Sequence, residues 1–176
     1  MLLEDRLFAQ HVGKSVLLDA NLLLVFLTGS FDEQLFGRFK RVSAYSVEDY
    51  RLLVRLLGFF RVLITTPHIL TEVSSLANHL PDRLKPDWYR SFGALLVAQD
   101  RFPNFLERWV PAGQLAATPE FAAFGIADAS VRALATEALI VTEDFRLSGV
   151  LKKQGVSVLN FEDIRKLRRA IGFDPE

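Results

Sequence analysis

Four acidic residues lie where a parallel α/β sheet would bring them to one edge: Asp19, Glu72, Asp128 and Asp144. Asp19 interrupts the apolar run SVLLDANLLL, and a carboxylate inside such a run needs a partner, a hydrogen bond or a metal ion in order to be buried. Carboxylate oxygens are the ligands that hard divalent cations prefer. These residue types therefore indicate metal-assisted chemistry, in which no side-chain nucleophile is needed.

The composition excludes several other kinds of chemistry. The chain has no cysteine, which removes disulfides, thiol catalysis and zinc–thiolate sites. Lys plus Arg and Asp plus Glu both number 21, so the formal net charge is zero and nucleic-acid binding would depend on a local patch. Half of the residues are hydrophobic, which is typical of a globular domain.

The first residues and the apolar runs bear on location. Glu4 and Asp5 interrupt the stretch in which a signal peptide would need a long apolar segment. The longest apolar runs are too short to span a bilayer. We therefore expect a cytoplasmic protein with no membrane partner.

Four apolar runs predict strands, and each of the four is followed by a helical pattern. The runs cover residues 15–19, 61–66, 138–142 and 156–160. The helices are expected over 20–29, 67–80, 143–155 and 161–171, the last being basic and amphipathic. Continuous apolar strands that alternate with helices predict an α/β fold, with a central parallel sheet of about four to five strands and helices on both faces.

Two segments do not fit this alternating unit and are interpreted as helical inserts. Residues 30–60 contain an expected helix at 46–58, because Ser46 and Asp49 have the spacing of a capping box. Residues 81–119 are expected to be helical around 86–108 and loop-like afterwards. Neither insert resembles an independent domain, so residues 1–176 are predicted to form one domain with a core at about 15–162.

The four acids are expected to converge because ligands bind at the carboxyl ends of parallel strands. Asp19 ends the first strand, and Asp144 lies just past the third. Glu72 lies in the first turns of the helix after the second strand, and Asp128 begins a helix that leads to the third. Such a cluster repels itself and is best explained by bound cations.

Each acid also has an ordinary structural interpretation when it is taken alone. Asp128 and Asp144 could be helix N-caps. Glu72 could be a solvated helix residue that the helix dipole favours. Asn21 could cap the helix that follows it. The coincidence of four acids at one edge favours the metal-binding interpretation.

Four segments, in order, resemble the motifs of PIN-domain nucleases over about residues 15–162: LLDANLLL, TPHILTEVSSL, GIADASVRAL and LIVTEDFRL. The resemblance implies that Asp19, Glu72, Asp128 and Asp144 hold Mg²⁺ or Mn²⁺ and cleave RNA. It also implies that Asn21 and Thr142 are supporting polar residues. Many members are the toxin ribonucleases of toxin–antitoxin pairs, so an antitoxin protein and a homodimer are further expected partners. The segment between Asp19 and Glu72 is longer than in compact toxin members, and the helix at 46–58 fills it.

Alternative interpretations remain at this level. A PIN-like fold that binds RNA or protein without catalysis is one, although such a module often lacks one or more of the acids. A haloacid-dehalogenase-type phosphatase is another alternative, but it would need a second Asp at the position of Asn21. Arg146 could contact a substrate phosphate or pair with a neighbouring acid. A basic cluster on the last helix could also follow a phosphate backbone or form a solvated face: Arg165, Lys166, Arg168 and Arg169.

Overall fold

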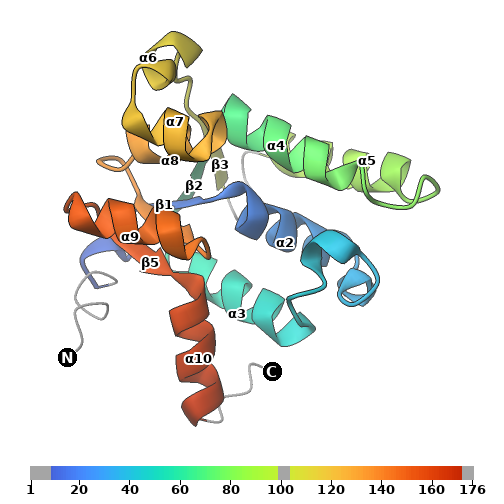
Figure 1. Cartoon of the computed structure of the whole chain (residues 1–176). Coiled ribbons are helices and arrows are strands. Elements are labelled where there is room, and N and C mark those ends of the chain that lie inside the picture. Colours follow the sequence, from blue (N-terminus) through green and yellow to red (C-terminus); the bar gives the residue numbers. More distant parts are fainter. Residues whose placement is uncertain (1–8, 99–103, 172–176) are drawn as a thin grey trace.

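The chain forms an α/β domain around a five-stranded, all-parallel sheet (Figure 1). The computed structural model describes residues 9–98 and 104–171, so Glu4 and Asp5 lie outside the described residues. The strand order is β3-β2-β1-β4-β5. The strands are β1 (Ser15–Leu18), β2 (Val62–Thr65), β3 (Asn104–Glu107), β4 (Leu139–Thr142) and β5 (Val158–Asn160). The predicted fold class is confirmed.

The helices connect these strands and cover the sheet. They are α2 (Ala20–Phe31), α3 (Val47–Leu57), α4 (Pro67–Ala77), α5 (Lys85–Val97), α6 (Ala112–Ala116), α7 (Pro119–Phe124), α8 (Ile126–Ala133), α9 (Phe145–Lys153) and α10 (Phe161–Ile171). Two 3₁₀ turns, η1 (Glu33–Leu35) and η2 (Lys40–Val42), lie between α2 and α3. The chain runs from β1 through α2 to β2 in one direction along the sheet, and from β4 through α9 to β5 in the other. Because such crossovers are right-handed, α2 and α9 fall on opposite faces. Figure 1 shows this arrangement, with α10 descending beside α3.

The central strand β1 is buried among its neighbours. Leu17 is fully buried and lies in register with Ile64 of β2 and Ile140 of β4. Strands covered on both faces are expected to be apolar along their length, as β4 is up to its last residue, with all four residues buried. The apolar runs that predicted these strands therefore form the core that fixes the sheet edge.

Local capping signals fix where several helices begin. Ser46 and Asp49 form the predicted capping box of α3, with each side chain accepting a hydrogen bond from the other residue's backbone N–H. Thr66 caps α4, in which Pro67 takes the first position. Gly155 has a φ of +73°, which suits the turn between α9 and β5.

The segment after α5 differs from the prediction. Residues 104–107, expected to be helical, form the edge strand β3, while residues 99–103 lie outside the described residues. The burial of β3 is low at both ends, because it is paired on one side only. A half-exposed strand gives no continuous apolar run, so the sequence did not reveal it. The following segment, predicted to be loop-like, contains the short helix α6.

The helix α2 also continues past Gly29, where it was expected to close. It ends at Phe31, and Gly29 lies against the ring of Tyr50 on α3. A Cβ atom at this position would lie 2.3 Å from the ring carbon Cδ2. The absence of a side chain therefore serves close packing between α2 and α3 rather than helix termination.

Within residues 9–98 and 104–171, no helix is both long enough and apolar enough to cross a bilayer.

Candidate active site at the strand ends

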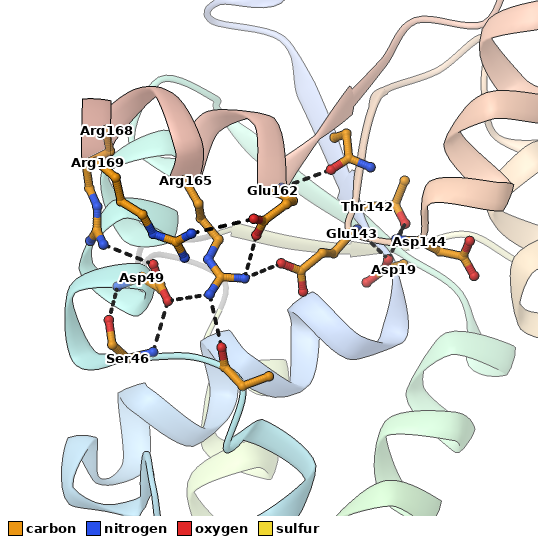
Figure 2. Close-up of polar contacts among 12 residues, drawn as sticks. Asp19, Ser46, Asp49, Thr142, Glu143, Asp144, Glu162, Arg165, Arg168 and Arg169 are labelled. Carbon is orange, nitrogen blue, oxygen red and sulfur yellow. Dashed lines mark hydrogen bonds and ion pairs between the residues drawn. The ribbon is translucent and has the colours of Figure 1, made fainter. Parts of the chain in front are cut away.

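Asp19 lies at the carboxyl end of β1 and is the N-cap of α2. Its Oδ1 accepts a hydrogen bond from the Leu22 backbone N at 2.8 Å. Its Oδ2 accepts hydrogen bonds from the Thr142 hydroxyl and from the Glu143 backbone N, the latter at 3.2 Å (Figure 2). The residue is only 3% exposed, and burial raises its pKa to about 6 although these hydrogen bonds lower it. Asp19 is thus a buried carboxylate held from both sides.

Asp144 is held in the turn between β4 and α9. It is the N-cap of α9, and its Oδ1 accepts from the backbone N of Arg146 at 2.7 Å and of Leu147 at 2.9 Å. Its own backbone N donates to the Thr142 Oγ1 at 3.0 Å. The capping interpretation of Asp144 is therefore confirmed. Thr142 connects Asp19 with Asp144, which is consistent with its predicted supporting position.

Asp128 lies in the first turn of α8, whose N-cap is Gly125, so the capping interpretation of Asp128 is wrong. Burial raises the pKa of Asp128 to about 7, and the negative charges of Asp19, Glu72 and Asp144 add to this effect. Asp128 therefore lies close enough to Asp19, Glu72 and Asp144 to be affected by their charges. The convergence of all four acids on one metal site stays a prediction.

Glu72 and Asn21 are both exposed to solvent. Glu72 is an exposed residue in the middle of α4, and partial burial of its carboxyl raises its pKa. Asn21 is exposed in the first turn of α2. Because Asp19 caps that helix, the interpretation of Asn21 as its cap is wrong.

A metal ion would need several of these carboxylates as ligands. In the part of the chain that the structure describes, no three Asp, Glu or His side chains form a group that could hold an ion as they stand. The donor chemistry nevertheless fits Mg²⁺ or Mn²⁺, because all four candidates offer carboxylate oxygens and the charges of three of them raise the pKa of Asp128. Asp19, Asp128 and Asp144, with Glu72, are the residues that would hold it.

A buried hydrogen bond joins the two helices that carry Glu72 and Asp128. The Thr66 Oγ1, which caps α4 by accepting from the Ile69 N, lies 2.8 Å from the Ser130 Oγ of α8. Both side chains are fully buried. Sequence reasoning missed this pair. A polar residue on an otherwise buried helix face was the one available signal, and it does not identify the partner.

Arg146 lies beside a groove next to Asp144. The groove has a volume of about 570 Å³ and is lined by Phe124, Phe145, Arg146 and Lys153, among others. The Arg146 guanidinium lies over the Phe124 ring, 5.4 Å from its centroid. Phe145 is 83% exposed.

Trp109 is 74% exposed. The His68 Nε2 lies 2.9 Å from the Val110 carbonyl oxygen. This contact does not connect His68 with the candidate acids.

The basic cluster on α10 is mostly engaged inside the protein. Arg165 is 9% exposed and pairs with Asp49 of α3 at 2.9 Å, and Arg168 pairs with the same carboxylate at 3.3 Å (Figure 2). Lys166 is exposed, and Arg169 is half-exposed and reaches Glu162 at 3.6 Å. The interpretations of this cluster as a solvated face or a phosphate-binding strip are wrong for Arg165 and Arg168.

Comparison with known proteins adds no family or relative: no protein-family model matches the chain, and no curated protein or solved structure matches it significantly.

Proposed function

We propose that the chain is a metal-dependent nuclease of the PIN type, an endoribonuclease that hydrolyses RNA phosphodiester bonds with Mg²⁺ or Mn²⁺. One observation carries this proposal. The pKa of Asp128 is raised to about 7 by burial and by the charges of Asp19, Glu72 and Asp144. A carboxyl group whose pKa is raised by burial and by three neighbouring acids is typical of functional sites.

The four acids differ in how firmly their carboxylates are held. Asp19 and Asp144 are held by backbone N–H groups, so their free lone pairs are directed without further ordering. Asp128 and Glu72 have no such hydrogen bond among the described contacts and can adjust. A divalent cation held there would activate water and stabilise charge at the reacting phosphate.

The groove beside Asp144 is where the substrate would lie. Arg146 offers a guanidinium for a phosphate, and Phe145 offers an exposed ring on which an unpaired base can stack. Lys153 adds a second cation to the lining. Since the chain has no net charge, this local patch would supply the electrostatic attraction to RNA.

Cleavage assays test the proposal directly. Purified protein is incubated with matched RNA and DNA strands, each in Mg²⁺, in Mn²⁺ and in chelator. RNA cleavage should require the metal and fall at least about 100-fold in Asp144→Asn. Asp82→Asn is the control, because its carboxylate is 96% exposed and pairs with Lys85 at the start of α5. Cleavage that persists in chelator, or that survives Asp144→Asn, would contradict the proposal.

A second candidate function is a PIN-like module that binds RNA or a protein partner without turnover. It is favoured by one observation, which is that no three of the described acids stand ready to hold an ion. The same assay separates the two. A binding module would retain RNA in a gel-shift experiment, give no cleavage in either metal, and show no Mn²⁺-dependent rise in melting temperature.

A further inference from the structure

Arg165 of α10 joins three segments that are distant in the sequence. Its guanidinium pairs with Asp49 of α3 at 2.9 Å, donates to the Ala44 carbonyl oxygen at 3.0 Å and pairs with Glu143 in the turn after β4. It also pairs with Glu162 on its own helix at 2.9 Å. Figure 2 shows the guanidinium at the centre of these contacts. Arg165 thus ties α10 and the 30–60 insert to the β4–α9 turn.

The geometry of the guanidinium explains why an arginine suits this position. Its planar fork can donate to several acceptors at once, whereas a lysine ammonium is a compact point charge. Arg165 lies over the Tyr45 ring, 5.2 Å from its centroid, which holds the plane of the fork. Asp49 is 2% exposed, so this ion pair is shielded from water and from salt.

Glu143 is the point at which this cluster meets the candidate active site. Its side chain belongs to the Arg165 cluster, while its backbone N donates to the Asp19 Oδ2 at 3.2 Å. Its neighbours in the chain are Thr142, whose hydroxyl donates to Asp19, and Asp144. The turn is therefore fixed on one side by Asp19 and on the other by Arg165.

We propose that Arg165 is a positioning residue that acts through Glu143, holding the turn that presents Thr142 and Asp144 against Asp19. Among the described contacts, Arg165 has none with Asp19, Glu72, Asp128 or Asp144. The effect on cleavage rests on the proposed nuclease function, whereas the positioning of the Glu143 backbone does not. The inference also gives the 30–60 insert a role, because Asp49 and Ala44 hold Arg165 from that side.

Two variants with the same change in charge test this proposal. Glu143→Ala and Glu162→Ala each remove one carboxylate partner of Arg165, but only Glu143 lies in the turn. Amide hydrogen exchange of the metal-free protein is followed at residue 143. Exchange there should become about tenfold faster in Glu143→Ala, while the β1 and β4 amides stay protected. In Glu162→Ala it should not change.

Metal affinity and rate provide the second readout. In Glu143→Ala the Mn²⁺ concentration for half-maximal thermal stabilisation should rise about tenfold, and kcat should fall with little change in KM. Glu143→Gln, which keeps an oxygen acceptor for Arg165, should recover most of the affinity and the amide protection. Equal effects of Glu143→Ala and Glu162→Ala would overturn the proposal and make Arg165 a purely structural residue. Absence of RNA cleavage by the unmodified protein would instead overturn the nuclease function, and the exchange experiment would still decide the positioning role.

Discussion

The acidic side chains at the strand ends and those around Arg165 differ in what lies between them. Around Arg165, the carboxylates of Asp49, Glu143 and Glu162 face a buried guanidinium within ion-pair distance. At the strand ends, Asp128 faces other carboxylates, and its pKa is raised by burial and by them. The first region is balanced by the protein's own cations, whereas in the second no ion pair is found between the four acids and a cation of the described residues. That difference is the basis for proposing a cationic ligand at the strand ends.

Removing the ion pairs around Arg165 should have the largest effect on stability. In Arg165→Met the shape is roughly kept but Asp49 loses its principal cation, and removing one partner of a buried pair costs about 3–5 kcal/mol. The free energy of unfolding, measured by urea denaturation, should fall by that amount. The matched control is Arg169→Met, because Arg169 is 51% exposed and should cost less than about 1 kcal/mol. Similar losses in both variants would contradict the difference drawn between the two arginines.

Displacing the insert that supports Arg165 should have the next largest effect. In Gly29→Ala the new Cβ would meet the Tyr50 ring at 2.3 Å, so α2 and α3 must move apart. Overpacking of this kind costs about 1–3 kcal/mol. Gly93→Ala on α5 is the control, since nothing lies within 4 Å of a Cβ there and a helix favours alanine. Thermal melts should therefore move in opposite directions for the two variants.

Removing one of the negative charges at the strand ends should stabilise the metal-free protein. The folded-state pKa is raised from 3.8 to about 6 for Asp19 and to about 7 for Asp128. The protonated forms of these two residues therefore favour folding below pH 3.8, and this stabilisation is lost as pH rises through 6 and 7. Asp128→Asn avoids the Asp128 part of this loss, because an asparagine does not ionise. At pH 8 it should raise the free energy of unfolding by about 1–2 kcal/mol after allowance for solvent screening, and at pH 4 by almost nothing.

The same change in charge at Asp19 should stabilise the protein less than Asp128→Asn does. Asp19→Asn keeps an oxygen for the Leu22 N but turns an amide toward the Glu143 N–H, so relief of repulsion is offset by a lost hydrogen bond. Urea denaturation of both variants in chelator at pH 4 and pH 8 provides the comparison. If Asp128→Asn destabilises the protein at pH 8, the strand-end acids are balanced by contacts like those around Arg165, and the contrast fails.

The sequence predicted the strand-end region better than the Arg165 cluster, for physical reasons. Buried parallel strands are continuous apolar runs, and Ser46 and Thr66 cap their helices through neighbours only three residues away. From the chain order we then predicted that the four acids lie at one edge, and the pKa of Asp128 is raised by the charges of the other three. Arg165, in contrast, pairs with Asp49 and Glu143, which only tertiary packing brings together. Periodicity marked it simply as part of a basic helix face.

The smallest expected effect concerns which cations remain available to a substrate. Arg165 and Arg168 are engaged with Asp49, so the salt dependence of RNA binding should come mainly from Arg146 beside the groove. Arg146→Ala should leave the melting temperature nearly unchanged and reduce the slope of log K against log salt by about 1, the loss expected for one phosphate contact. Lys166→Ala, an equal charge change at an exposed position on α10, should leave the slope as it is. Fluorescence anisotropy with a short labelled RNA, in chelator to prevent cleavage, measures both variants over a salt series. A slope that falls in Lys166→Ala but not in Arg146→Ala would place the RNA along α10, and would make the balanced region, rather than the groove beside Asp144, the nucleic-acid surface.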